Sequence, residues 1–294
     1  MALIRSGFSH HMKHCPYCGA EYPDDASMCS IDGQPLQENV PQPPPTSEQV
    51  KAAGKKTAYL TFPDYEWSAR DAWKCLGMIV VFQFLLDFLI AMVELCFPSF
   101  FRWRASGIGY FSTYLLYYAV NLLTAAYFAR TDHFKTFWKG FGLDRKPSNY
   151  VWLGVTVPIL INFFGHFMRI HGWGKGIHSY DIDAFRHTFG LEKYLFLGPL
   201  VLLAPLFEES INRGFLYKAF RGSFGIGISM VLILAWTAYN HWWEYRQSLL
   251  AVFDISVLTI IQCYLREKSD SLWDCILCHL AFNGSGLFIY GALR

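Results

Sequence analysis

Long apolar blocks fill most of the chain beyond residue 74, and short polar segments separate them. The blocks span 75–97, 108–129, 150–170, 194–218, 226–243, 247–265 and 271–292. About 20 mostly apolar residues suffice for an α-helix to cross a bilayer. Gly222, Gly225 and Gly227 lie around one junction, and we interpret them as small residues that ease helix packing. The pattern predicts an all-α polytopic membrane helix bundle of about seven transmembrane helices, within a range of roughly six to eight.

Composition agrees with a membrane chain, and it changes sharply near the N-terminus. The chain is 53% hydrophobic and 16% charged, whereas soluble domains carry about 25% charged residues. Together with the apolar blocks, this argues against a soluble all-helical protein. The net charge of +2 is too small to indicate a nucleic-acid partner. We predict a small module over 1–36, a Pro-rich flexible linker over 37–57 and a transmembrane domain over 58–294.

Lysine and arginine are distributed unevenly between the two sets of connecting segments. If the N-terminus lies inside, the inside segments carry fifteen such residues: Lys51, Lys55, Lys56, Arg70, Lys74, Arg130, Lys135, Lys139, Arg145, Lys146, Arg213, Lys218, Arg221, Arg266 and Lys268. The outside segments then carry eight: Arg102, Arg104, Arg169, Lys175, Arg186, Lys193, Arg246 and Arg294. Because cytoplasmic segments are enriched in Lys and Arg, we predict an integral cell-membrane protein with a cytosolic N-terminus.

Polar side chains inside the apolar blocks are energetically expensive unless paired, so each is a candidate for function. The candidates are Asp87, Glu94, Glu208, Glu209, Arg213, Asn240, His241, Asp254, His279 and Asn283. Glu209 and Arg213 are four residues apart, so they share a helix face and can pair. Glu208 is rotated by about 100° from Glu209, which leaves it free to face a cavity. Repulsion between the adjacent carboxylates favours one of them as a general base.

His279 and Asn283 are also four apart and project from one helix face. A neutral His and an Asn amide both donate hydrogen bonds, which suits an oxyanion hole. His241 comes from a third helix and could share the proton transfer with Glu208. Glu208 lies roughly 21 Å along its block at the rise of an α-helix, whereas His241 falls near the outer end of the next. The two side chains meet only if helices are tilted, offset or re-entrant.

At these residues the chain resembles the CAAX-protease and bacteriocin-processing (CPBP) family of intramembrane proteases, which includes the CAAX prenyl proteases. The family motifs correspond to Glu208, Glu209 and Arg213 (Glu-Glu-x-x-x-Arg), to His241 (Phe-x-x-x-His), and to His279 and Asn283 (His-x-x-x-Asn/Asp). The motif core covers about 194–290. Thr237 stands in place of the Phe, and we expect Trp236 to supply the aromatic surface.

The resemblance implies an intramembrane endopeptidase that hydrolyses a peptide bond with an activated water. Glu208 would be the general base, assisted by His241. His279 and Asn283 would hold the oxyanion, and Glu209 and Arg213 would position the base. The implied partners are membrane lipid and a peptide or protein substrate, since the family includes enzymes that trim prenylated proteins and mature peptides.

Three alternatives stay open. In the first, Glu208, His241 and His279 bind zinc in a metalloprotease site. We favour the metal-free glutamate mechanism, because the chain lacks the His-Glu-x-x-His helix of common zinc proteases. The second is a catalytically silent membrane scaffold or sensor. The third is a transporter that relays protons through its buried Glu and His residues.

The polar N-terminus contains a cysteine cluster typical of a zinc ribbon. Cys15 and Cys18 form a Cys-Pro-x-Cys-Gly knuckle, Cys29 follows, and Asp32 takes the place of the usual fourth Cys. Zinc accepts carboxylate oxygen, so we predict structural zinc bound by Cys15, Cys18, Cys29 and Asp32, with His11 or His14 as the alternative fourth ligand. A metal-free remnant is the competing interpretation. The module would bind a protein partner or regulate, not catalyse.

Overall fold

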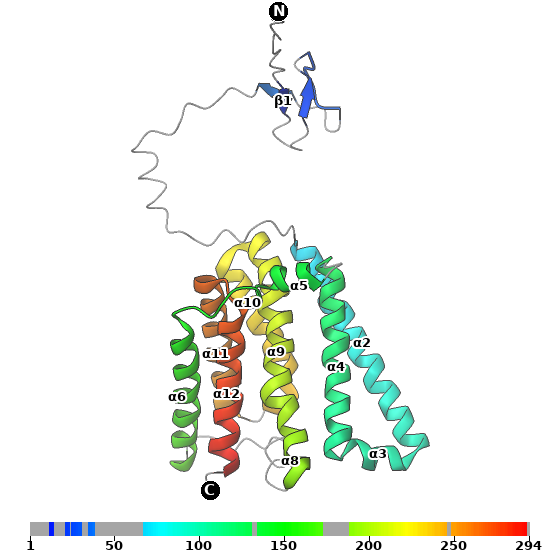
Figure 1. Cartoon of the computed structure of the whole chain (residues 1–294), viewed down its shortest axis with the longest axis vertical. Helices are drawn as coiled ribbons and strands as arrows, with labels where there is room; N and C mark the ends of the chain where they lie inside the picture. The colour runs from blue at the N-terminus through cyan, green and yellow to red at the C-terminus, as the bar shows by residue number, and fades with distance from the viewer. Residues whose placement is uncertain are drawn as a thin grey trace, which may run out of the picture. The chain divides into compact units, whose positions relative to one another are not determined.

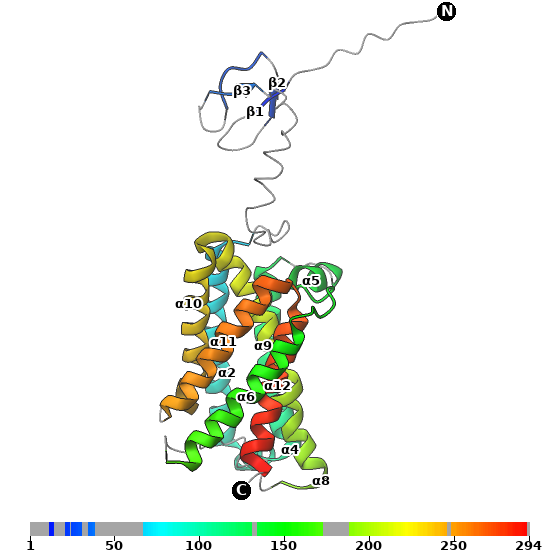
Figure 2. The ribbon, with the colours of Figure 1, turned by 90° about the vertical axis from the view of Figure 1, so that its left-hand side faces the viewer.

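The N-terminal unit contains a small antiparallel sheet. The computed structural model describes residues 12–14, 21–23, 25–30, 35–38, 67–130, 134–172, 188–245 and 248–292, and the chain divides into two compact units, Met1–Tyr59 and Leu60–Arg294. In the first unit β1 (Met12–His14) lies between β2 (Glu21–Pro23) and β3 (Gln37–Glu38), as Figure 2 shows. Cys29 is buried, and its Sγ atom lies 3.1 Å from the Tyr22 hydroxyl. Cys15, Cys18 and Asp32 lie outside the described residues, so the zinc site stays a prediction.

The second unit is a bundle of helices. It contains α2 (Ala69–Cys96), α3 (Pro98–Arg104), α4 (Gly107–Phe128), α5 (Phe134–Phe141), α6 (Val151–Ile170), α8 (Gly190–Leu197), η1 (Gly198–Leu203), α9 (Ala204–Glu209), η2 (Ser210–Leu216), α10 (Tyr217–Tyr245), α11 (Leu249–Ser269) and α12 (Leu272–Ala292). Each predicted apolar block is helical over nearly all of its length, which confirms the all-α bundle, but the block 194–218 runs through α8, η1, α9 and η2 into α10. Figures 1 and 2 show the long helices lying side by side, with α3 joining α2 and α4 at one end.

Five helical runs in the described part of the chain are long and apolar enough to cross a membrane. They are Ala69–Cys96, Val151–Ile170, Gly190–Trp242, Leu249–Ser269 and Leu272–Tyr290. The third run is 53 residues long and contains two of the predicted blocks. Large apolar side chains such as Phe84, Leu89 and Phe163 are exposed on the outside of the bundle, where lipid would cover them.

Serine side chains fix the start of three long helices. The Oγ of Ser68 accepts a hydrogen bond from the Asp71 N–H, and the Asp71 carboxylate accepts from the Ser68 N–H, which makes a capping box for α2. Ser106 caps α4 in the same way through the Gly109 N–H, and Ser248 caps α11. These caps satisfy backbone donors that the first helical turn leaves unpaired.

Gly225 breaks the longest helical run and lets the chain reverse. Its φ of 77° lies in the region that favours glycine. After the reversal α10 contacts η2 and α11, and Figure 2 shows it beside α11. A Cβ at Gly225 or at Gly227 would meet nothing within 4 Å. The interpretation of these two residues as packing glycines is therefore wrong, since Gly225 is required by backbone conformation rather than by a close neighbour.

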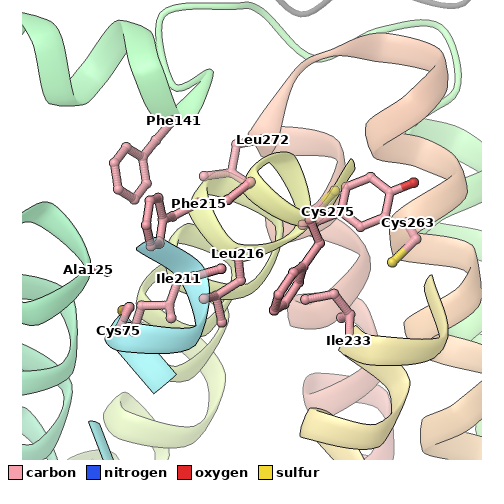
Figure 3. Packing of buried hydrophobic residues seen from close by; sticks show 14 of the residues in the cluster. Cys75, Ala125, Phe141, Ile211, Phe215, Leu216, Ile233, Cys263, Leu272 and Cys275 are labelled. Atoms are coloured by element: carbon pink, nitrogen blue, oxygen red, sulfur yellow. The ribbon is translucent and has the colours of Figure 1, made fainter. Parts of the chain in front are cut away.

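A buried cluster packs η2 against the helices around it. Phe215 and Leu216 of η2 are fully buried against Phe141, Ile233 and Leu272, as Figure 3 shows. The rings of Phe141 and Phe215 stack with centroids 6.5 Å apart. Lipid tails are as apolar as these side chains, so close packing rather than expulsion from water stabilises the cluster. The result is a rigid platform directly after the two glutamates.

Candidate active site

The glutamates lie on a helical turn between two segments of π-helix. η1 precedes α9, and η2 follows it immediately after Glu209. Pro199 and Pro205 lie in the first turns of η1 and α9, and proline has no N–H to donate to the preceding turn. π-Helical turns are rare in proteins, and those that occur are often found at functional sites. The backbone thus marks this region as a candidate site independently of the side chains.

Glu209 is the hub of a buried hydrogen-bond network. Its exposed fraction is 0%, and its Oε1 atom accepts from three donors. These are Arg213 Nη1 at 3.1 Å, Gln262 Nε2 at 2.9 Å and His279 Nδ1 at 2.8 Å. The predicted pairing of Glu209 with Arg213 is confirmed. A buried carboxylate needs such partners because burial strips its water, so one charge ties η2, α11 and α12 together.

Gln262 was not identified from the sequence. It lies within a predicted apolar block, where an amide side chain was the only available signal. Its Nε2 atom also lies 3.4 Å from the carbonyl of Cys275, and the Cys275 thiol donates to the Gln262 carbonyl at 3.3 Å. Gln262 is therefore held from two sides while it donates to Glu209.

Glu208 has the opposite environment. It is only partly buried, and its Oε1 accepts a hydrogen bond from the Tyr118 hydroxyl at 3.2 Å. It lines a cavity of about 700 Å³, whereas the network described above holds Glu209. The predicted division of the two carboxylates, one neutralised by Arg213 and the other facing a cavity, is confirmed by this geometry.

The cavity collects the polar groups from all three motif segments. Its walls include Glu208, Arg213, His241, His279 and Asn283. Glu208 and His241 line the same cavity, although their positions along the predicted helices place them at different depths in the membrane. They come together because the helical run that carries Glu208 continues to Gly225, and the chain then runs back beside it. Five residues that are distant in sequence therefore face one space of a size typical of small-ligand sites.

The hydrogen bonds of His279 and Asn283 refine their expected roles. A carboxylate only accepts hydrogen bonds, so the His279 Nδ1 that faces Glu209 carries a hydrogen. The other ring nitrogen can then donate only when the ring is protonated. The Asn283 Nδ2 donates to the Leu200 carbonyl of η1 at 2.9 Å, and its second hydrogen stays available. Both side chains are thus held in place by hydrogen bonds to other elements.

Trp236 occupies the wall next to Thr237, where the family motif has Phe. Both residues line the cavity, and the indole N–H of Trp236 donates to the Asn212 Oδ1 at 3.1 Å. This bond fixes the indole ring. The expected aromatic surface is therefore present beside the site, supplied by the neighbouring residue.

A metal site among the described residues would need His, Cys, Asp or Glu side chains that lie close together. Within these residues no group of three or more His, Cys, Asp or Glu side chains has a geometry that could hold a metal ion. The buried thiols of Cys263, Cys275 and Cys278 surround the Glu209 and Arg213 pair as small apolar groups.

Comparison with known proteins identifies one family. Residues 190–285 match the family model described as Rce1-like, type II CAAX prenyl endopeptidase. No curated protein and no solved structure matches the chain. The matched segment contains all six motif residues, from Glu208 to Asn283, and it confirms the resemblance to CAAX proteases over this part of the chain. With the apolar helices, it supports an integral membrane protein with protease activity on peptides.

Proposed function

We propose that this chain, which is Rce1-like over residues 190–285, is an intramembrane endopeptidase that uses Glu208 to activate a water molecule. The contrast between the two adjacent glutamates carries the proposal. Glu209 is fully buried and its Oε1 atom holds three donors, so it is not placed to take a proton from a water in the cavity. Glu208 faces the cavity, where one tyrosine hydroxyl is its partner among the described residues. A general base must reach the water that it activates.

The reaction proceeds as an addition followed by an elimination. Glu208 takes a proton from the water, with His241 on the same cavity sharing the proton transfer, and the water oxygen bonds to the carbonyl carbon of the peptide. The oxyanion that forms is stabilised by the charged ring of His279 and by the free amide hydrogen of Asn283. The carbon–nitrogen bond then breaks, and the proton passes to the departing amine.

Glu209 and Arg213 act as positioning residues in this scheme. Glu209 orients the His279 ring and stabilises its charge, as carboxylates commonly do for a histidine. Arg213 neutralises the carboxylate that would otherwise repel an ionised Glu208. The pair thus supports the oxyanion side of the site as well as the base, a wider role than the sequence indicated.

The setting of the enzyme is also part of the proposal. The N-terminus lies in the cytosol, as the distribution of Lys and Arg favours. The N-terminal module binds structural zinc and a protein partner. Prenylated proteins and peptides that require maturation are the substrate classes, and the cavity contains enough polar groups to hold an extended peptide.

The test is cleavage of a quenched-fluorescent peptide library by the purified full chain in detergent or nanodiscs. The wild type is compared with Glu208→Gln and with Glu267→Gln as the matched control, each with and without a strong chelator. Glu267 bonds to Tyr217 and Arg221 and does not line the cavity. We expect cleavage by the wild type and by Glu267→Gln, none by Glu208→Gln, and no effect of the chelator.

Other outcomes have distinct meanings. Cleavage that the chelator abolishes would support the zinc metalloprotease. Wild-type rates in Glu208→Gln would exclude Glu208 as the base. Folded wild-type protein that cleaves nothing in the library, nor any prenylated peptide, would favour the scaffold or sensor.

A further inference from the structure

The cavity extends beyond the catalytic groups to a carboxylate that the proposed reaction does not use. Asp254 is on the second turn of α11 and lines the cavity with Asn162 of α6 and Tyr290 of α12. Its exposed fraction is 3%. None of the three motifs includes Asp254. An ionisable side chain within a membrane-spanning helix is a functional candidate, because it is costly to keep there.

Asp254 stands apart from the other carboxylates that line the cavity. Glu94 forms an ion pair with Arg104, Asp87 accepts a hydrogen bond from Tyr117, and Glu208 accepts one from Tyr118. Asp254 has no hydrogen-bond partner among the described residues, and its Oδ1 atom is buried. A buried carboxylate oxygen without a donor costs free energy that a ligand bearing donors would recover.

Arg169 of α6 does not fill this role. Arg169 attracts Asp254 electrostatically, but no ion pair joins the two in the described part of the chain. The Arg169 guanidinium lies over the Tyr290 ring at 3.8 Å, and its Nε donates to the Gly165 carbonyl at 3.0 Å. A Cβ at Gly165 would lie 3.0 Å from the Asp254 Oδ2, so α6 packs tightly against one side of the carboxylate. The open side of Asp254 is the cavity.

We propose that Asp254 forms a subsite of the cavity that binds the cationic side chain of a lysine or arginine in the peptide substrate. This inference rests on the proposed protease function and names a substrate class for it. An ammonium or guanidinium group provides several donors together with a positive charge. It would satisfy the partnerless oxygen and neutralise a charge buried in the membrane.

The test uses pairs of quenched-fluorescent peptides that differ only by lysine or norleucine at one position near the cleaved bond. Norleucine keeps the aliphatic chain and lacks the charge. We expect the wild type and Glu267→Gln to favour the lysine peptide at one position by about tenfold in kcat/KM, a typical effect of one close charge pair. Asp254→Asn should lose the preference, so that it cleaves the lysine and norleucine peptides of each pair at equal rates.

Two outcomes would overturn the subsite. One is equal cleavage of the lysine and norleucine peptides of every pair by the wild type, a result that can be obtained without any variant. The other is an Asp254→Asn variant that slows all peptides equally and unfolds at a lower temperature, since that is the behaviour of a structural partner of Arg169.

A binding experiment separates this inference from the chemistry. Fluorescence anisotropy gives the affinity of labelled lysine and norleucine peptides for Glu208→Gln and for the double variant Glu208→Gln/Asp254→Asn. Tighter binding of the lysine peptide that disappears with Asp254 supports the subsite even if no variant cleaves, in which case only the proposed protease function fails. Equal binding of the two peptides by Glu208→Gln overturns the subsite whether or not the wild type cleaves.

Discussion

The Nδ1 atom of His279 lies 2.8 Å from the Oε1 atom of Glu209, and this hydrogen bond joins motifs that are 70 residues apart. It links the helix that carries both glutamates to the helix that carries the predicted oxyanion donors. The bond also determines which ring nitrogen of His279 faces the cavity. The residues of the proposed catalytic site are therefore connected to each other through Glu209.

Replacement of Glu209 by Gln should slow catalysis and destabilise the protein. The His279 ring would lose its counter-charge, so we expect kcat/KM to fall by about 100-fold, the usual effect of weakening oxyanion stabilisation. Arg213 would become a buried cation without a carboxylate, which costs about 3 kcal/mol. Peptide cleavage and thermal unfolding in detergent measure the two effects. A variant with wild-type kcat/KM would contradict the role of Glu209 in positioning His279.

Two substitutions of Gln262 should have graded effects. Gln262→Leu removes one donor to Glu209 and leaves the other two, so kcat should fall about tenfold, as for other groups that orient a catalytic residue. Gln262→Glu places a second carboxylate against Glu209, and repulsion should cause a larger loss. Steady-state kinetics with one peptide measures both, with KM expected to stay near the wild-type value. Equal rates in wild type and both variants would show that Gln262 is not part of the site.

Removal of the Tyr118 hydroxyl tests the environment of the base. Tyr118→Phe keeps the ring that stacks on Phe207 with centroids 5.6 Å apart and deletes the hydrogen bond to Glu208. One hydrogen bond to a charged group contributes about 1.5 kcal/mol, so kcat should change by roughly tenfold. Tyr117→Phe is the matched control, since Tyr117 bonds to Asp87 instead. An equal effect of both variants would argue against a specific role for Tyr118.

Alanine at Gly225 should destabilise the bundle. The combination of φ 77° and ψ 179° is populated essentially by glycine, and a residue with a Cβ there costs about 1–3 kcal/mol. Gly227→Ala is the control, because an added Cβ there has open space and a helical backbone, where Ala is favoured by up to about 1 kcal/mol. Thermal unfolding of the two variants should differ in sign. Equal melting temperatures of the two variants would show that a Cβ at residue 225 does not strain the backbone there.

The sequence alone was enough to place the helices and to pair Glu209 with Arg213. A membrane-spanning helix must be long and apolar, and residues four apart on a helix must be neighbours, so both features are local. The division of labour between Glu208 and Glu209 follows from the same local geometry. The packing role predicted for Gly225 is wrong, because hydrophobic periodicity carries no information about the backbone conformation of a single residue.

Only the tertiary structure decided which distant groups meet. Gln262 and His279 reach Glu209 from two other helices, and Asp254 lies in the cavity without a donor from the residues that the structure describes. Both follow from the rotation and depth of each helix, which depend on packing against its neighbours. Hydropathy specifies that a segment crosses the membrane and says little about its rotation. The motif residues of the site could therefore be named from the chain, but Gln262, the hydrogen bonds of the site and the position of Asp254 in the cavity required the assembled bundle.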